Sequence, residues 1–384
     1  MAQRSIVKLL FIDASRGIGG TEHHAVALTC AMRDIGHDVR ALIRDGTWLA
    51  GAFENAGIAT EAIVFRGGFD PRLMKRLYAA IRDFRPDWLI SNDSRLYWPL
   101  VVVGRSTGVR VALFRHLASI SKAVTRRWIP RLADRFFVVS NYQRAKLARD
   151  GALATHLKVL YNPIDLARFC PSAECRNAFR NRIDSSSHDI IVGFAGRPAP
   201  EKGIFVLEQA LTLAMRRVAR LRAVWIGEGP ALERLSGKIQ ASAYARRHAL
   251  LSYESDLSAV LPGLDLLAVP SLSLETFGRI SAEAQACGVP VVCSDSGGLA
   301  ETLRPGTSGH LVPAGDAYAL AQQILALTCN DVLRSEMGRQ AHRHAGRFCA
   351  LRVARMFEAA LADADFVPAP PALHAERHEI TQRP

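Results

Sequence analysis

The sequence predicts an α/β protein with two similar domains, each built around a doubly wound parallel sheet. Short runs rich in Val, Ile, Leu and Phe alternate with longer stretches of helical hydrophobic spacing along most of the 384 residues. The runs are continuous, which is typical of parallel strands buried on both faces, and their alternation with helices indicates βαβ units. At about 150 residues per domain, the length also favours two domains.

The expected strands fall into two sets separated by a linker. The first domain, 1–170, is expected to contain the runs 7–12, 39–43, 88–91, 109–114 and 136–140. The second domain, 189–345, is expected to contain the runs 190–195, 223–226, 264–269 and 289–294. Between the sets, prolines 163 and 171 and three consecutive serines interrupt the rhythm, so we expect a linker over 171–188. A C-terminal helix over 346–362 and a disordered, proline-containing tail over 363–384 are expected to follow.

Composition is typical of an ordinary globular protein. Hydrophobic residues make up 49% and charged residues 22%. No apolar run approaches the roughly 18 residues that a bilayer-spanning helix needs, and the first one, 6–12, contains Lys8 and has no cleavage site after it. The seven cysteines are scattered, with no CxxC pair and no metal-ligand spacing. We therefore expect a cytoplasmic protein with reduced cysteines and no metal site.

The positive charge is concentrated in the first half of the chain. Residues 1–170 carry 26 Lys and Arg against 14 Asp and Glu, a balance of +12, whereas residues 171–384 carry 23 against 22, a balance of +1. Such a half is typical of contact with an anionic partner: nucleic acid, an acidic membrane surface or an acidic substrate. A basic face that serves solubility alone is the alternative.

A glycine-containing loop follows the first expected strand. Gly17, Gly19 and Gly20 precede a helical pattern, and the free N–H groups of a helix start can meet an anion there. The loop is not the dinucleotide fingerprint, because Glu22 stands where the third glycine would be. A tight turn capped by Thr21 is the alternative.

A similar loop follows the strand expected at 190–195. It carries Arg197 and Lys202 between two glycines, at the carboxyl end of a parallel strand, where open α/β sheets bind ligands. Two cations in such a loop suit a phosphate or diphosphate. Singly, each could be a solvated surface charge.

The most specific segment, 270–298, is expected to run strand, loop, helix, strand. Glu275 precedes the helix and Glu283 lies within it eight residues later, so both carboxylates can face one cleft. The amides of Phe277 and Gly278 at the helix start can meet an anion. Hydrogen bonds to sugar hydroxyls would explain the two carboxylates. A helix-dipole contact for Glu275 and a solvated position for Glu283 are the alternative.

In their order and spacing these motifs resemble a retaining glycosyltransferase of the large family four, with the GT-B architecture of two facing Rossmann-like domains. The resemblance covers roughly residues 5–360 and rests on Gly19-Gly20, Val138-Val-Ser140, Asn162-Pro-Ile-Asp165, Gly196-Arg197 with Glu201-Lys202-Gly203, Ile226-Gly-Glu-Gly-Pro230 and the Glu275 and Glu283 pair. It implies transfer of a hexosyl group from a nucleotide sugar, such as a UDP- or GDP-sugar, to a glycan or lipid-linked glycan. Cell-envelope polysaccharide biosynthesis, such as that of lipopolysaccharide, is the expected setting.

The resemblance also implies how the donor phosphates would be held. The first domain would bind the acceptor and the second the nucleotide sugar. Arg197 and Lys202 would contact the diphosphate, and Gly19 and Gly20 would close on it from across the cleft. Fixed cations and amides of this kind make a metal dispensable, so we expect no metal and no cofactor. The one Asp-x-Asp string, Asp363 to Asp365, has no buried strand before it.

Three further residues take roles by the same resemblance. Glu283 would hold the ribose hydroxyls, and Glu275 would hold the donor sugar near its reacting carbon. His116, at the end of the strand expected at 109–114, would face that sugar. The sequence departs from the family pattern at Thr276 and Pro163, where the family usually has glycine, which concerns loop detail and donor sugar more than reaction class.

One basic segment, 121–131, favours a membrane contact. It supplies four cations and one aromatic side chain: Lys122, Arg126, Arg127, Trp128 and Arg131. With the neighbouring Ile129 as apolar partner of Trp128, this mixture is typical of a stretch that lies on an anionic membrane surface. We expect peripheral attachment to the inner face of the cell membrane, with a solvated helix as the alternative.

Two other classes of function stay open. A nucleotide-sugar epimerase or a phosphorylase would use the same architecture, although the segment with Glu275 and Glu283 fits a transferase better. A nucleic-acid-binding protein would explain the pI of about 9.8. Against it, the sequence has no basic stripe with interleaved aromatics, no zinc-finger spacing and no RNA-recognition motif.

Overall fold

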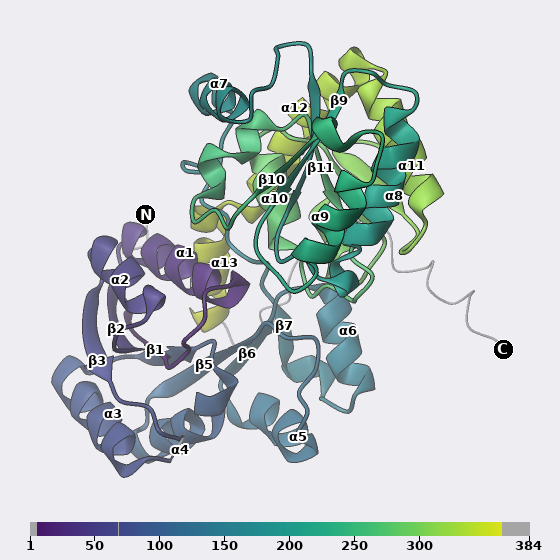
Figure 1. Ribbon diagram of the computed structural model, residues 1–384. Helices are drawn as coiled ribbons and strands as arrows, with labels where there is room; N and C mark the ends of the chain where they lie inside the picture. Colours follow the sequence, from purple (N-terminus) through teal and green to yellow (C-terminus); the bar gives the residue numbers. More distant parts are fainter. Residues whose placement is uncertain (1–5, 68, 363–384) are drawn as a thin grey trace.

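The computed structural model describes residues 6–67 and 69–362, so the tail expected over 363–384 lies outside the described residues. Two parallel sheets form two facing α/β domains (Figure 1). The first sheet has seven strands in the order β3-β2-β1-β4-β5-β6-β7, and the second has six in the order β10-β9-β8-β11-β12-β13. Both orders are those of doubly wound sheets, which confirms the expected fold class.

The central strands coincide with the nine apolar runs of the sequence, and the edge strands were missed. The strand bounds are β1 Lys8–Asp13, β2 Asp38–Arg44, β3 Ala59–Ile63, β4 Trp88–Ser91, β5 Arg110–Arg115, β6 Arg135–Val138, β7 Leu157–Val159, β8 Ile190–Ala195, β9 Leu221–Ile226, β10 His248–Leu251, β11 Leu266–Val269, β12 Val291–Ser294 and β13 Gly309–Val312. The missed strands β3, β7, β10 and β13 are the four sheet edges. In β3 only Ile63 is fully buried, so its side chains form no continuous apolar run.

Helices cover both faces of each sheet. Their bounds are α1 Gly20–Asp34, α2 Trp48–Asn55, α3 Pro71–Phe84, α4 Tyr97–Thr107, α5 Ala123–Leu132, α6 Asn141–Arg149, α7 Ala173–Arg182, α8 Ile204–Met215, α9 Leu232–Gln240, α10 Arg279–Ala286, α11 Ala317–Thr328, α12 Asp331–Ala345 and α13 Ala350–Ala362. Helices α3 to α6 pack on one face of the first sheet, and α1, α2 and α13 on the other. Helices α8, α9 and α11 cover one face of the second sheet, and α7 and α10 the other. Within the described residues, none of these helices combines the length and apolarity needed to cross a bilayer.

The segment expected as a linker, 171–188, contains helix α7. Phe179 and Ile183 are buried in the core of the second domain. The guanidinium of Arg180 forms an ion pair of 3.0 Å with Asp265, which precedes β11. Most of this segment therefore packs as part of the second domain.

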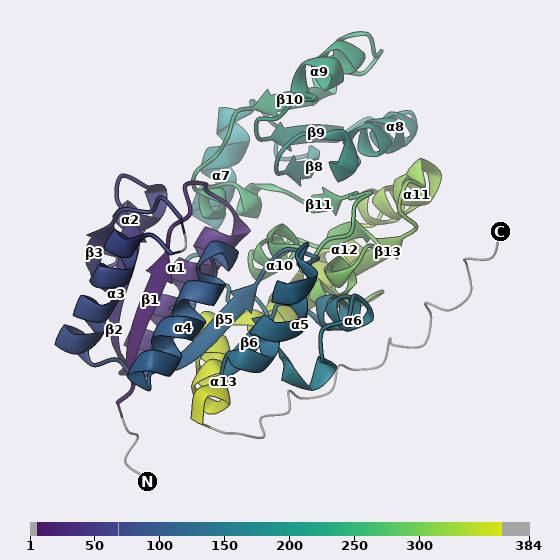
Figure 2. The same cartoon turned by 90° about the horizontal axis from the view of Figure 1, so that it is seen from below.

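The last helix, α13, crosses back onto the first domain (Figure 2). The ring centroid of Phe357 lies 5.4 Å from that of Phe114 in β5 and 5.2 Å from that of Phe137 in β6. Val353 and Leu361 are buried in the same cluster. The core of the first domain therefore contains side chains from both ends of the described chain.

A second link between the domains runs through Glu301. This residue lies on the 3-10 helix Gly298–Thr302 of the second domain, and its carboxylate accepts hydrogen bonds from the backbone N–H groups of Asn141 at 2.9 Å and Tyr142 at 2.6 Å. The hydroxyl of Tyr161 donates to the same carboxylate at 2.9 Å. Because Asn141 begins helix α6, the negative charge also lies favourably against the helix dipole. This contact stabilises the placement of one domain against the other.

Phe357→Ala is expected to lower the free energy of unfolding by about 3–5 kcal/mol, because it leaves a cavity where a large aromatic side chain packed. The Phe357 side chain is fully buried. Urea unfolding followed by circular dichroism measures the change. The control is Arg355→Ala, at an exposed position of the same helix, which should change stability by less than about 0.5 kcal/mol. Equal effects of the two substitutions would contradict the packing described here.

Candidate active site between the two domains

The carboxyl ends of the strands in both sheets face a common cleft. The strand order reverses between β1 and β4 in the first sheet and between β8 and β11 in the second, and doubly wound sheets bind ligands at such points. A cavity of about 1080 Å³ lies there and is lined by both domains. It brings together every site residue expected outside the 121–131 segment: Gly19, Gly20, His116, Arg197, Lys202, Glu275, Phe277, Gly278 and Glu283.

The glycine turn of the first domain becomes the start of helix α1. Gly19 is the N-cap residue with an extended backbone, and within the described chain no side chain caps the helix, so Thr21 does not take the capping role considered above. A Cβ atom added at Gly20 would meet no atom within 4 Å. The first N–H groups and the positive end of the helix dipole therefore form an open surface suited to an anion.

The loop after β8 brings a lysine against the first acidic residue of the 270–298 segment. Gly203 has a positive φ of 71°, and a Cβ atom there would lie 1.8 Å from the carbonyl oxygen of Pro270. Only glycine allows this approach of the two backbones. As a result, the Nζ of Lys202 lies 2.6 Å from the Oε1 of Glu275, which also accepts a hydrogen bond of 2.6 Å from the hydroxyl of Ser271.

Arg197 is held less firmly than Lys202. Its guanidinium pairs with Glu201 on the same loop, and the two side chains are 58% and 45% exposed. An exposed pair of this kind contributes little to stability, because solvent screens it. The Arg197 side chain can therefore exchange this partner for a ligand in the cavity at small energetic cost.

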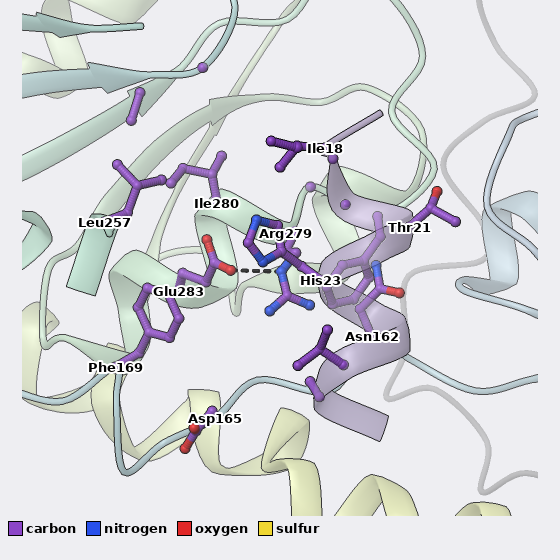
Figure 3. Close-up of a pocket in the computed structure, with 18 of the residues that line it drawn as sticks. Ile18, Thr21, His23, Asn162, Asp165, Phe169, Leu257, Arg279, Ile280 and Glu283 are labelled. Carbon is purple, nitrogen blue, oxygen red and sulfur yellow. Dashed lines mark ion pairs between the residues drawn. The ribbon is translucent and has the colours of Figure 1, made fainter. Parts of the chain in front are cut away.

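Glu283 is buried and paired with an arginine that sequence reasoning missed. The Oε1 of Glu283 lies 2.7 Å from the Nε of Arg279 (Figure 3). Burial raises the pKa of Glu283, and the charge of Arg279 opposes that rise. Arg279 also donates a hydrogen bond of 3.0 Å to the carbonyl oxygen of Pro163. The i,i+4 spacing of Arg279 and Glu283 on a helix was the available signal for this pair.

His116 follows β5 and lies in an aromatic and histidine cluster. Its ring centroid is 4.5 Å from that of His24 in a T-shaped contact. Burial, with a smaller contribution from the charges of Arg115 and Arg279, lowers the pKa of His116 to about 3. The imidazole is therefore neutral near pH 7 and can donate or accept one hydrogen bond without carrying charge.

The segment expected at the membrane lies outside the cleft. Its residues Arg126, Arg127, Trp128 and Arg131 belong to helix α5, and Lys122 is the N-cap. Trp128 is 46% exposed, whereas Ile129 is fully buried in the core of the first domain. The expected apolar pair is therefore wrong, and Trp128 presents apolar surface there together with Val124, which is 62% exposed. The guanidinium of Arg126 donates to the carbonyl oxygen of Ile120 at 2.7 Å.

Two family descriptions match the chain, one on each domain. The family described as "Glycosyltransferase Family 4" matches residues 18–168, and that described as "Glycosyl transferases group 1" matches residues 176–344. The two matches meet at the segment that contains the start of α7. Together they include all nine residues that the cleft brings together.

Two curated relatives extend this comparison. D-inositol 3-phosphate glycosyltransferase of Salinispora tropica is 34% identical over 232 residues, which is 56% of this chain and 48% of that protein. Phosphatidyl-myo-inositol mannosyltransferase of Mycobacterium leprae is 29% identical over 335 residues, 82% of this chain and 85% of that protein. The match thus spans about half the length of the first relative and most of the second.

A solved structure supports the same assignment for the fold. HepE of Anabaena, in complex with UDP, superposes with a TM-score of 0.81 at 21% identity, over 92% of this chain and 99% of that one. At this identity the likeness concerns the fold alone. The two family matches and the two facing Rossmann-like domains together show that the chain belongs to glycosyltransferase family 4 and has the GT-B fold.

Proposed function

We propose that the chain is a retaining hexosyltransferase that moves a sugar from a nucleoside-diphosphate donor to an anionic glycan or lipid-linked glycan acceptor. The observation that carries this proposal is the cleft itself. There, cations and carboxylates of the second domain share one cavity with the uncapped start of helix α1 in the first domain. A diphosphate and a sugar are the groups that such a combination can bind together.

The donor diphosphate lies between the two domains in this proposal. Arg197 and Lys202 contact it from the second domain, and the amides beside Gly19 and Gly20 from the first. To do so, Lys202 leaves or shares its ion pair with Glu275. The freed carboxylate of Glu275 then accepts hydrogen bonds from the donor sugar. Binding of the diphosphate and orientation of the sugar are thus coupled through one ion pair.

The buried carboxylate of Glu283 binds the nucleoside end of the donor in this proposal. Its pairing with Arg279 keeps the carboxylate in one orientation, in which its second oxygen can accept hydrogen bonds from ribose hydroxyls. Burial strengthens such hydrogen bonds, because little water competes for them. Arg279 thus acts as a positioning residue for Glu283.

Transfer proceeds on one face of the sugar in this proposal. The bond between the anomeric carbon and the diphosphate oxygen breaks, the acceptor oxygen forms the new bond from the same side, and the acceptor proton passes to the leaving phosphate oxygen. The preorganised charges of Arg197 and Lys202 stabilise the negative charge that develops on the diphosphate, so catalysis requires no metal ion. The neutral His116 hydrogen-bonds the donor sugar.

The charge of the first domain, to which the acceptor is assigned, favours an anionic acceptor. The first half of the chain carries the excess of +12, and the two relatives above are named for an inositol phosphate and for phosphatidyl-myo-inositol, both of which bear phosphate. The exposed Trp128 among the basic residues of α5 supports peripheral attachment to the inner face of the cell membrane. A role in cell-envelope biosynthesis follows from that location.

Incubation with a panel of UDP-, GDP- and ADP-sugars and phosphate-bearing inositol or lipid-linked acceptors tests the reaction. We expect one donor to give a product in which the anomeric configuration of the sugar is retained, as read by NMR, and the yield to persist in excess EDTA. An inverted product, or activity lost in EDTA and restored by Mg²⁺ or Mn²⁺, would overturn the mechanism. Tight binding of a DNA fragment without any transfer would instead favour a nucleic-acid-binding protein.

Lys202→Ala is expected to weaken nucleoside-diphosphate binding about tenfold to a hundredfold, since hydrogen bonds to charged groups contribute about 1.5–3 kcal/mol. The substitution also leaves the carboxylate of Glu275 unpaired beside the diphosphate. Calorimetric titration with UDP and GDP measures the affinity. Lys238→Ala, on the exposed side of α9 outside the cavity, is the matched control. Equal affinities of the two variants would remove Lys202 from the donor site.

Glu275→Gln and Glu283→Gln are expected to separate turnover from affinity. The first should lower mainly kcat, because Glu275 is assigned to the sugar, and the second should mainly weaken nucleotide binding, because Glu283 is assigned to the ribose. Steady-state kinetics and nucleotide titration report the two effects. Glu233→Gln at an exposed position of α9 is the control. Wild-type values of both quantities in both variants would show the assignment to be wrong.

Binding to vesicles that contain anionic lipid is expected to exceed binding to neutral vesicles and to fall as salt rises. Each basic group near such a surface is worth about 1 kcal/mol, and salt screens it. Sedimentation across a salt series measures this, with Lys122→Gln/Arg127→Gln/Trp128→Ala as the weakened variant and Lys238→Gln as control. Binding to both vesicle types alike, or to neither, would remove the membrane from the proposal.

A further inference from the structure

We propose that the chain has a second ligand site, separate from the cleft, which binds a small phosphate-bearing anion such as a diphosphate or triphosphate. The site is a pocket of about 430 Å³ whose lining includes four arginines, Arg304, Arg343, Arg347 and Arg352. The other lining residues are Thr307, Gln340, His344 and Gly346. No residue of this set lines the cleft cavity. The pocket is therefore not an extension of the donor site.

The arginines reach the pocket from four different elements. Arg304 lies in the loop between the Gly298–Thr302 helix and β13, and Arg343 lies near the end of α12. Arg347 lies on the 3-10 helix Gly346–Phe348, and Arg352 lies in the first turn of α13. The four guanidinium groups thus border one hollow from separate elements, and those of Arg304, Arg343 and Arg352 are also exposed to solvent.

The pocket has almost no compensating negative charge. Among the described residues, no carboxylate lies within ion-pair distance of Arg304, Arg347 or Arg352. Arg343 is 3.8 Å from Glu336, and the Glu336 carboxylate already pairs with Arg339 and accepts a hydrogen bond of 2.8 Å from Gln340. Four guanidinium groups around one hollow repel each other, and the donors of Arg304, Arg347 and Arg352, which have no carboxylate partner among the described residues, match phosphate oxygens.

Neutral polar groups complete the pocket wall. The side chains of Thr307 and Gln340 line it, and the Nε2 of His344 is buried without a hydrogen-bond partner in the described part of the chain. Burial, with a smaller contribution from the charges of Arg347 and Arg304, lowers the pKa of His344 to about 4, so the ring is neutral near pH 7. A neutral imidazole in the pocket wall does not add to the repulsion among the arginines.

The position of the pocket gives it a structural consequence. The guanidinium of Arg347 stacks on the ring of Tyr161, 5.0 Å from its centroid, and Tyr161 donates to Glu301 in the contact between the domains. Arg352 belongs to α13, which packs on the first domain, while Arg304 and Arg343 belong to the second. An anion held by all of them would join elements that are fixed to different domains.

The small volume of the hollow favours a free small anion over a membrane headgroup. A lipid surface is broad and contacts residues that project from a protein, such as Trp128 on α5. A hollow of about 430 Å³ bordered by four arginines instead suits a compact ligand with two or more negative charges. Inorganic pyrophosphate is the simplest probe of this chemistry.

Calorimetric titration of pyrophosphate into the full chain tests the site, with the Arg197→Ala/Lys202→Ala background used to remove the cations of the cleft. We expect one equivalent to bind at physiological ionic strength and to raise the Tm. Adding Arg343→Gln and Arg352→Gln should weaken this binding at least tenfold and abolish the Tm shift. Arg355→Gln, an exposed arginine of α13 that does not line the pocket, should leave both unchanged.

A second variant distinguishes loss of the anion site from loss of folding in the Arg343→Gln/Arg352→Gln variant. Arg304→Gln changes a different element of the pocket and should weaken binding in the same direction, while circular dichroism confirms that each variant is folded. The proposal is overturned if pyrophosphate does not bind, or if the pocket variants bind it as tightly as the Arg355→Gln control. It is also overturned if vesicles with phosphorylated lipid bind through these arginines and free pyrophosphate does not.

Discussion

Parallel strand pairing is the constraint on which the rest of this structure depends. All strand pairs in both sheets are parallel, so every carboxyl end in a sheet lies at the same edge. The reversal of strand order then leaves one point in each sheet where neighbouring connections depart to opposite faces. The glycine turn of α1 occupies that point in the first domain, and the loops after β8 and β11 occupy it in the second. The cleft forms where the two points face each other.

The amino-acid sequence predicts the strands correctly where burial determines residue type. The central strands are enclosed on both faces and carry continuous apolar runs, so each of them was predicted. The edge strands β3, β7, β10 and β13 pair on one side only and keep polar side chains, as in β3 with its Thr60 and Glu61. Such strands form because they pair with a neighbouring strand, and a local hydrophobic pattern does not predict that pairing.

The candidate site was predictable as a set of loops but not as a set of contacts. Motif order placed Lys202 and Glu275 in the same cleft, but their ion pair depends on the backbone approach that Gly203 allows. The i,i+4 spacing of Arg279 and Glu283 permits their ion pair, but many helical pairs at this spacing are solvated, so the spacing alone does not single this one out. Trp128 and Ile129 are adjacent in sequence but do not form one apolar surface, because consecutive residues of a helix point about 100° apart. One therefore faces solvent and the other the core.

Helix α13 has a consequence for how the protein is made. Phe357 and its neighbours complete the aromatic core between β5 and β6, although they belong to the last described helix. A ribosome that adds about 5–20 residues per second needs roughly 10–40 s to travel from residue 170 to residue 357. The second domain emerges entirely within that interval, so the domain that is synthesised first is the last to close its core. Until then, the aromatic side chains of β5 and β6 that α13 covers stay exposed on the nascent chain, although α1 and α2 already cover the rest of that face. This aromatic area is where a chaperone would be most needed.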